Sequence, residues 1–156
     1  MPTTILASVD PADGRVDART EQGEAIHMAA DPPEGPGSAA APKEALLAAL
    51  AGCTSMDVAS ILRKKRQAAT RYEVAVSGES ADEHPRVFVT ITVEHRVRGE
   101  VEPEALRRSI ELSATRYCPV SAMLSASVRI EHWYRLNDSG ESVLVAVTGP
   151  QGSEVL

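Results

Sequence analysis

The chain has 156 residues, a length that suits one domain with a hydrophobic core of its own. Hydrophobic residues make up 43% and charged residues 24% of the sequence, which excludes intrinsic disorder and a fibrous protein as first interpretations. The net charge of −6 argues against nucleic-acid binding, because affinity for phosphate backbones depends on clustered Lys and Arg.

Neither a signal peptide nor a membrane span is expected. The segment Met1–Ile5 has no basic region followed by a long apolar region. No segment contains the roughly 18 unbroken apolar residues that a membrane-spanning helix needs. We therefore expect a cytoplasmic protein without a membrane partner, in which cysteines are reactive or simply buried rather than joined in a structural disulfide.

The first forty residues predict a β-meander that leads into a loop. The three predicted strands are Thr3–Val9, Arg15–Thr20 and Ala25–Ala30. Turns are predicted at Asp13-Gly14 and at Glu21–Glu24. The segment Asp31–Pro42 is rich in Pro, Gly, Ser and Ala and has no apolar period, which favours a loop.

A long central helix is predicted from Lys43 onward. One stripe at helical spacing consists of Leu46, Leu50, Cys53, Asp57 and Ile61. Further apolar residues widen this stripe over most of the circumference, and a helix of that kind is buried. The basic run Arg63–Arg66 fits the C-terminal end of the helix, where cations offset the helix dipole.

The second half of the chain predicts strands and two shorter helices. The predicted strands are Tyr72–Ser77, Val87–Val93, Ile130–Leu136 and Val143–Val147. A helix opens at Glu102–Glu104, and its inner face consists of Leu106, Ile110 and Ala114. Pro119 ends this helix and starts the next one, Val120–Val128. The final segment, Thr148–Leu156, is predicted to be a frayed tail.

Each of the two cysteines lies in a distinctive setting. Cys53 follows Gly52, and a glycine within a helix suggests that a backbone or a substrate approaches closely. Cys118 directly precedes Pro119, where unpaired amides at the start of a helix stabilise a thiolate. Taken alone, these residues leave open that both cysteines are inert and buried. A C-x-x-C motif is absent, and two Cys with four dispersed His make a weak case for zinc.

Two segments resemble the OsmC/Ohr hydroperoxide-reductase superfamily. PKEALLAALAGCTSMDVASILRKKR, from Pro42 to Arg66, resembles its central cysteine helix. RYCPVSAMLSASVRIEH, from Arg116 to His132, resembles its second cysteine segment. The first segment is more similar to the general OsmC-like subgroup than to Ohr proper. The predicted order of strands and helices agrees with the superfamily.

This resemblance implies an α+β fold and an intertwined homodimer. The implied protomer has an N-terminal β-meander, a central buried cysteine helix, and a second β-sheet with C-terminal helices. Residues 1–136 would form the single OsmC-like domain. Residues 137–156 would be a C-terminal extension, with one strand and then the tail.

The resemblance also implies thiol-dependent reduction of organic hydroperoxides. Cys53 would attack the peroxide and become a sulfenic acid, and Cys118 would resolve it as a disulfide. A dithiol or lipoyl reductant would restore the pair, without a metal or an organic cofactor. The alternatives are a non-enzymatic redox-sensing or small-molecule-binding stress protein, and a structural dimer whose cysteines belong to the core.

A peroxidatic thiol also needs a cation, and a carboxylate to orient it. The resemblance implies an arginine from the N-terminal strands, and we favour Arg15 over Arg19. Glu44 is the candidate carboxylate, although nine helical residues place it about 180° around the axis from Cys53. Its other role is to offset the helix dipole. Asp57, one turn beyond Cys53 on the same face, is a second candidate, but a buried and ionised Asp57 would oppose thiolate formation.

Overall fold

The computed structural model describes residues 2–29 and 39–156, and the chain divides into two compact units, Met1–Leu46 and Leu47–Leu156. The first unit contains an antiparallel three-stranded sheet in the order β1-β2-β3. Its strands are β1 (Ile5–Val9), β2 (Val16–Thr20) and β3 (Ala25–Met28). The predicted β-meander is therefore confirmed. Ala30 and most of the predicted loop lie outside the described residues.

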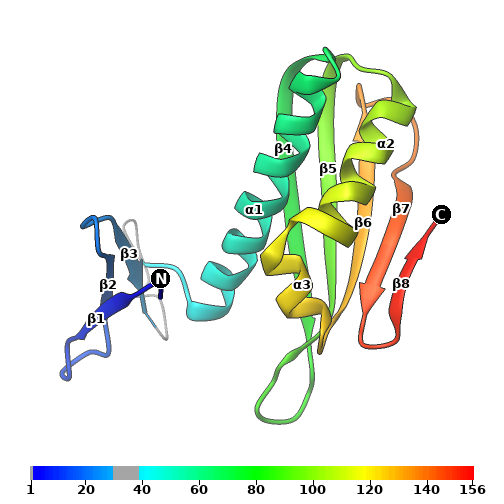
Figure 1. Cartoon of the computed structure of the whole chain (residues 1–156). Coiled ribbons are helices and arrows are strands. Elements are labelled where there is room, and N and C mark those ends of the chain that lie inside the picture. Colours follow the sequence, from blue (N-terminus) through cyan, green and yellow to red (C-terminus); the bar gives the residue numbers. More distant parts are fainter. Residues whose placement is uncertain (1, 30–38) are drawn as a thin grey trace. The chain divides into compact units, whose positions relative to one another are not determined.

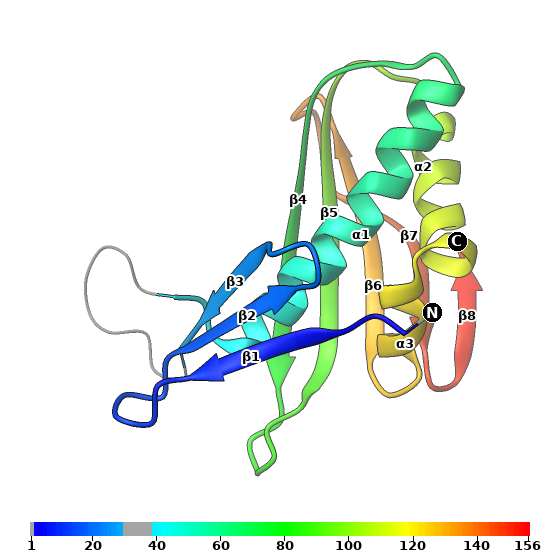
Figure 2. The same cartoon turned by 60° about the vertical axis from the view of Figure 1, so that its left-hand side comes forward.

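The second unit is built on a five-stranded sheet in the order β4-β5-β6-β7-β8. Its strands are β4 (Ala68–Ser80), β5 (Phe88–Glu100), β6 (Arg129–Leu136), β7 (Val143–Gly149) and β8 (Gly152–Val155). Only β5 and β6 pair in parallel among these strands. A parallel pair needs a long crossover, which here contains the shorter helices. Figures 1 and 2 show the helices on one face of this sheet.

The central helix, α1, spans Pro42–Lys64. Pro42 occupies the first helical position, where its missing N–H costs nothing. The buried residues are spaced four apart: Leu50, Thr54, Val58 and Leu62. The buried stripe therefore lies one residue beyond the predicted one at Cys53, Asp57 and Ile61. The side chains of Cys53 and Asp57 are half-buried at the edge of the observed stripe.

The crossover consists of α2 (Pro103–Leu112), a π-helical turn η1 (Ser113–Tyr117) and α3 (Pro119–Ser125). The predicted inner face of the second helix is confirmed, since Leu106, Ile110 and Ala114 are all buried. The predicted break before Pro119 is also confirmed. In η1 the N–H of Cys118 donates to the carbonyl of Ser113, and single π-helical turns are frequent at functional sites.

Two apolar clusters fill the space between the helices and the five-stranded sheet. The first cluster contains Val58, Leu62, Val97, Val101, Leu106, Ile110, Ala114, Val145 and Ala146. The second contains Leu50, Ile91, Val93, Cys118, Val128 and Ile130. Both clusters use residues of α1, so this helix packs on the sheet along most of its length.

Two sequence predictions need correction. The prediction of a frayed tail at Thr148–Leu156 is wrong, because β7 extends to Gly149 and β8 pairs with it. The third helix ends at Ser125 rather than Val128.

By length and composition alone, α1 is apolar enough to cross a membrane. Core helices of other proteins meet the same criteria, and α1 contributes Leu50, Val58 and Leu62 to the core. We therefore regard α1 as a core helix.

Candidate thiol site

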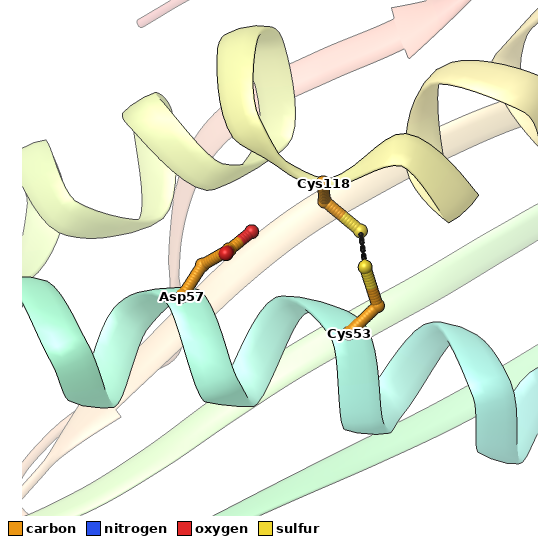
Figure 3. Close-up of side chains that lie close together, drawn as sticks. All are labelled: Cys53, Asp57 and Cys118. Atoms are coloured by element: carbon orange, nitrogen blue, oxygen red, sulfur yellow. Dashed lines mark hydrogen bonds between the residues drawn. The ribbon is translucent and has the colours of Figure 1, made fainter. Parts of the chain in front are cut away.

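The two cysteines, 65 residues apart in sequence, meet in the second unit. The Sγ atoms of Cys53 on α1 and Cys118 between η1 and α3 lie 2.8 Å apart, and both cysteines are free thiols (Figure 3). This distance is shorter than the roughly 3.5–4.0 Å at which non-bonded carbon atoms pack. It is longer than the S–S bond of a disulfide, about 2.05 Å. The two thiols are therefore placed for disulfide formation with a small side-chain adjustment.

Cys118 is the N-cap residue of α3, and its position follows from the local sequence. Pro119 occupies the first helical position, and Cys118 takes an extended conformation before it. The Cys118 Sγ accepts a hydrogen bond from the N–H of Ser121 at 3.3 Å. The side chain is buried. Burial, the adjoining Cys53 thiol and the Asp57 carboxylate raise the pKa of Cys118, and the Ser121 N–H opposes this only in part.

A carboxylate lies beside the thiols on a chain of hydroxyl groups. The Ser113 hydroxyl donates to Asp57 Oδ2 at 3.0 Å and lies 3.0 Å from the Thr54 hydroxyl. Since a serine hydroxyl has one hydrogen, Thr54 donates to Ser113. These bonds orient Asp57. One of its carboxylate oxygens and the two sulfur atoms all lie within 4.8 Å of one another. Sequence reasoning named Asp57 as a second candidate carboxylate and as an opponent of thiolate formation, but not its bond to Ser113.

The sequence carried a signal for this polar chain that we did not use. Ser109 and Ser113 fall on the same helical face as Leu106 and Ile110, and both serines are fully buried. A buried hydroxyl on an apolar face needs a hydrogen-bond partner. The partner of Ser109 is the carbonyl of Ala105, whereas Ser113 bonds across to α1. The bond of Ser113 is the informative one, because it connects the π-helical turn η1 to the cysteine helix α1.

The surroundings of the thiols are apolar, with one open side. Cys53 packs against the cluster that contains Cys118, and it is only half-buried. A Cβ atom added at Gly52 would find no atom of the described residues within 4 Å. The close approach expected at Gly52 is therefore not made by this part of the chain. Cys53 is the more accessible thiol of the two.

Glu44 has a structural partner of its own. Its Oε2 accepts a hydrogen bond from the N–H of Ala41 at 2.9 Å. A glutamate in the first turn that bonds back to the amide just before the helix is half of a capping box. This contact supports the other role that the sequence left open, in which Glu44 offsets the helix dipole at the start of α1. A contribution of Glu44 to the chemistry of Cys53 stays a prediction.

The supporting arginine also stays a prediction. Arg15 is exposed just before β2, where its N–H donates to Asp13 Oδ1 at 2.9 Å. Arg19 is exposed on β2, and its guanidinium bonds to the carbonyl of Gly23. Both belong to the N-terminal unit. Among the described residues, no cation is found among the groups that shift the pKa of Cys118.

A second buried polar cluster lies on the sheet and was not anticipated. His95 on β5 and His132 on β6 are fully buried, and the Tyr72 hydroxyl lies 2.6 Å from His95 Nδ1. Within residues 2–29 and 39–156, both ring nitrogens of His132 and Nε2 of His95 lack a hydrogen-bond partner. Burial lowers the pKa of His132 to about 4, and burial together with His132 lowers that of His95 to about 3. Both imidazoles are neutral at physiological pH.

Comparison with known proteins agrees with this architecture. A family model described as OsmC-like protein matches residues 35–132. Protein YhfA of Escherichia coli is 39% identical over 99 residues, which cover 63% of this chain and 74% of YhfA. The alignment therefore spans most of that relative.

Two solved structures share the fold. An OsmC-like protein from Mycoplasma pneumoniae superposes with a TM-score of 0.75 at 18% identity, covering 87% of this chain and 97% of the other. An organic hydroperoxide resistance protein OsmC from Legionella pneumophila superposes with a TM-score of 0.64 at 14% identity, covering 86% and 96%. At these identities the likeness concerns the fold. The family match and the architecture together establish that this chain belongs to the OsmC-like protein family.

Proposed function

We propose that this protein reduces organic hydroperoxides with Cys53 as the attacking thiol and Cys118 as the resolving thiol. The observation that carries the proposal is the 2.8 Å separation of the two Sγ atoms in an apolar, partly open site. The family membership supports a role in redox stress. Hydroperoxide resistance is named for the structural neighbour from Legionella pneumophila, which supports the choice of substrate.

The two thiols differ in the way that this division of labour requires. Cys53 is half-buried and lies beside the open position at Gly52, so a peroxide can reach it. Cys118 is 2% exposed, and its raised pKa keeps it protonated while its S–H donates to Cys53 Sγ. The resolving thiol is therefore already in contact with the attacking sulfur when the product has to be resolved.

The reaction proceeds in two balanced steps. The Cys53 thiolate attacks the outer oxygen of ROOH, the O–O bond breaks, and the alkoxide takes up a proton to leave as an alcohol. Cys53 is then a sulfenic acid. Cys118 sulfur attacks the Cys53 sulfur, the S–O bond breaks, and the hydroxyl leaves as water with the proton of Cys118. A dithiol or lipoyl group reduces the disulfide by thiol–disulfide exchange.

We assign the supporting cation to Arg15 and place the reaction in an intertwined homodimer in the cytoplasm. Large apolar side chains that the described residues leave uncovered support the dimer: Met56 on α1 is 74% exposed, and Met123 on α3 is 68% exposed. Isolated exposed apolar residues are ordinary. These two lie on the cysteine helices, which the family arrangement brings together in the middle of the dimer. Glu44 orients Arg15 in this scheme only if its bond to Ala41 is released.

Steady-state turnover tests the proposal. The protein, an organic hydroperoxide and a small dithiol are mixed, and the loss of peroxide is followed against wild-type, Cys53→Ser and Cys118→Ser proteins. We expect catalytic consumption by the wild type and none by Cys53→Ser. Stoichiometric oxidation of the wild type without turnover by any dithiol, including dihydrolipoamide, would favour the redox-sensor alternative. Thiols that stay reduced in the folded protein would favour a structural role.

A further inference from the structure

The thiol site contains a third potential metal ligand. Cys53 Sγ, Cys118 Sγ and a carboxylate oxygen of Asp57 lie within 4.8 Å of one another, and all three side chains point into one space between α1 and the Cys118 segment (Figure 3). Sulfur and carboxylate donors are both ligands of Zn²⁺. The sequence argument against zinc counted only Cys and His, so it omitted this carboxylate.

Neighbouring residues hold these three donors in place by hydrogen bonds, as they do around the ligands of a metal site. Ser113 donates to Asp57 Oδ2, and Thr54 supports Ser113, so the carboxylate is held with one of its oxygens near both sulfur atoms. The Ser121 N–H donates to Cys118 Sγ. Hydrogen bonds that orient ligating groups in this way are a regular feature of metal sites.

The charge balance also favours a cation. Metal binding replaces the protons of both thiols, and the resulting thiolates and the Asp57 carboxylate would repel one another without a cation, because the low dielectric strengthens Coulomb interactions. A divalent cation would neutralise most of this charge.

The sulfur–sulfur distance suits an exchange between two states. Tetrahedral Zn–S bonds of about 2.3 Å place two thiolates about 3.8 Å apart. A disulfide brings them to about 2.05 Å. The observed 2.8 Å lies between these values, so each arrangement requires a shift of about 1 Å in the distance between the two sulfur atoms.

We propose that the reduced protein binds one thiophilic divalent cation, Zn²⁺ or a chemical equivalent, through Cys53, Cys118 and Asp57. Water completes the tetrahedron on the open side. Three protein ligands with one open position form the usual pattern of reactive rather than structural zinc sites. Binding does not depend on the proposed peroxidase activity.

A regulatory consequence follows only if that activity is correct. A bound cation holds both thiolates and slows the first attack on peroxide. When peroxide oxidises the pair, the Zn²⁺-bound dithiolate, ROOH and two protons give the disulfide, ROH, water and free Zn²⁺. The oxidant would thus release the cation. An abundant supply of the cation would restrain turnover.

Metal titration tests the site. Reduced, metal-free protein is titrated with Zn²⁺ against a chromophoric chelator, and with Co²⁺ to observe thiolate-to-metal charge transfer and tetrahedral ligand-field bands. We expect one ion per chain, with loss of the charge-transfer bands when both cysteines are replaced by Ser. Asp57→Asn should weaken Zn²⁺ binding by about tenfold or more.

The matched control is Asp82→Asn, because Asp82 is an exposed carboxylate in the bend between β4 and β5. It should bind Zn²⁺ as the wild type does. Equal affinity in Asp57→Asn, with its fold verified by circular dichroism, would overturn the proposal. Binding that survives loss of both cysteines would also overturn it. Peroxide consumption by metal-free wild type is measured separately, so either the metal site or the peroxidase can fail alone.

Discussion

His132→Leu should make the protein less sensitive to acid. His132 is fully buried on β6, and within the described part of the chain neither ring nitrogen has a hydrogen-bond partner. Burial lowers its pKa from 6.5 to about 4. As the pH falls below 6.5, the unfolded chain binds a proton at this position and the folded chain does not. Stability is therefore complete above pH 6.5 and is lost as the pH falls through 4.

The size of this effect follows from proton linkage. One additional proton on the unfolded chain changes the free energy of unfolding by about 1.4 kcal/mol per pH unit. Between pH 6.5 and 4, His132 alone accounts for roughly 3 kcal/mol. His95 remains in the variant and also resists protonation, so acid sensitivity is reduced and not abolished. At pH 7 the variant should be at least as stable as the wild type, since an unpaired buried polar group is costly.

Urea unfolding at a fixed protein concentration and several pH values between 4 and 7 measures this difference. The control is His84→Gln, because His84 is an exposed histidine in the turn after β4 and should leave the acid sensitivity unchanged. The reasoning would be refuted if His132→Leu and the wild type lost stability in parallel over this range. A parallel loss would mean that the variant and the wild type take up the same number of protons on unfolding.

Three further predictions concern the thiol site and its helix. Cys118→Ser should accumulate a Cys53 sulfenic acid after one equivalent of peroxide, which dimedone traps and mass spectrometry detects; an absence of adduct would contradict the division of labour. Glu44→Ala should lower the free energy of unfolding by about 0.3–1.5 kcal/mol through loss of the cap; a loss of peroxide consumption beyond this destabilisation would support its role beside the thiol, and full consumption would exclude that role. Met56→Glu should weaken the homodimer in sedimentation, because it places a charge on the apolar surface of α1; an unchanged dimer would exclude this surface from the interface.

Much of the fold was predictable because local signals agreed with the global arrangement. Pro119 ends one helix and starts the next, and this alone predicts Cys118 at the start of α3. The spacing of Leu106 and Ile110 likewise identified the inner face of α2. Each of these features depends on a few neighbouring residues, which is the range over which sequence patterns are reliable.

The remainder depends on contacts between distant segments. Thr148–Leu156 was predicted to fray, yet β7 provides an edge on which Gly152–Val155 pairs as β8. The stripe on α1 was displaced because the sheet, and not the helix, determines which residues are covered. Asp57 became a candidate ligand only when Cys118, 61 residues later in the chain, was placed beside it. The strand predicted to end at Val93 extends to Glu100 as β5, which brings in His95 and its contact with Tyr72.

The most direct test of the central claim is a single oxidation. The fully reduced, folded protein receives one equivalent of an organic hydroperoxide, and intact mass and free thiols are then measured. The account predicts rapid loss of both thiols and of two hydrogen atoms, with a Cys53–Cys118 disulfide within one chain. Thiols that remain free, or a disulfide that joins two chains and leaves this pair open, would contradict it.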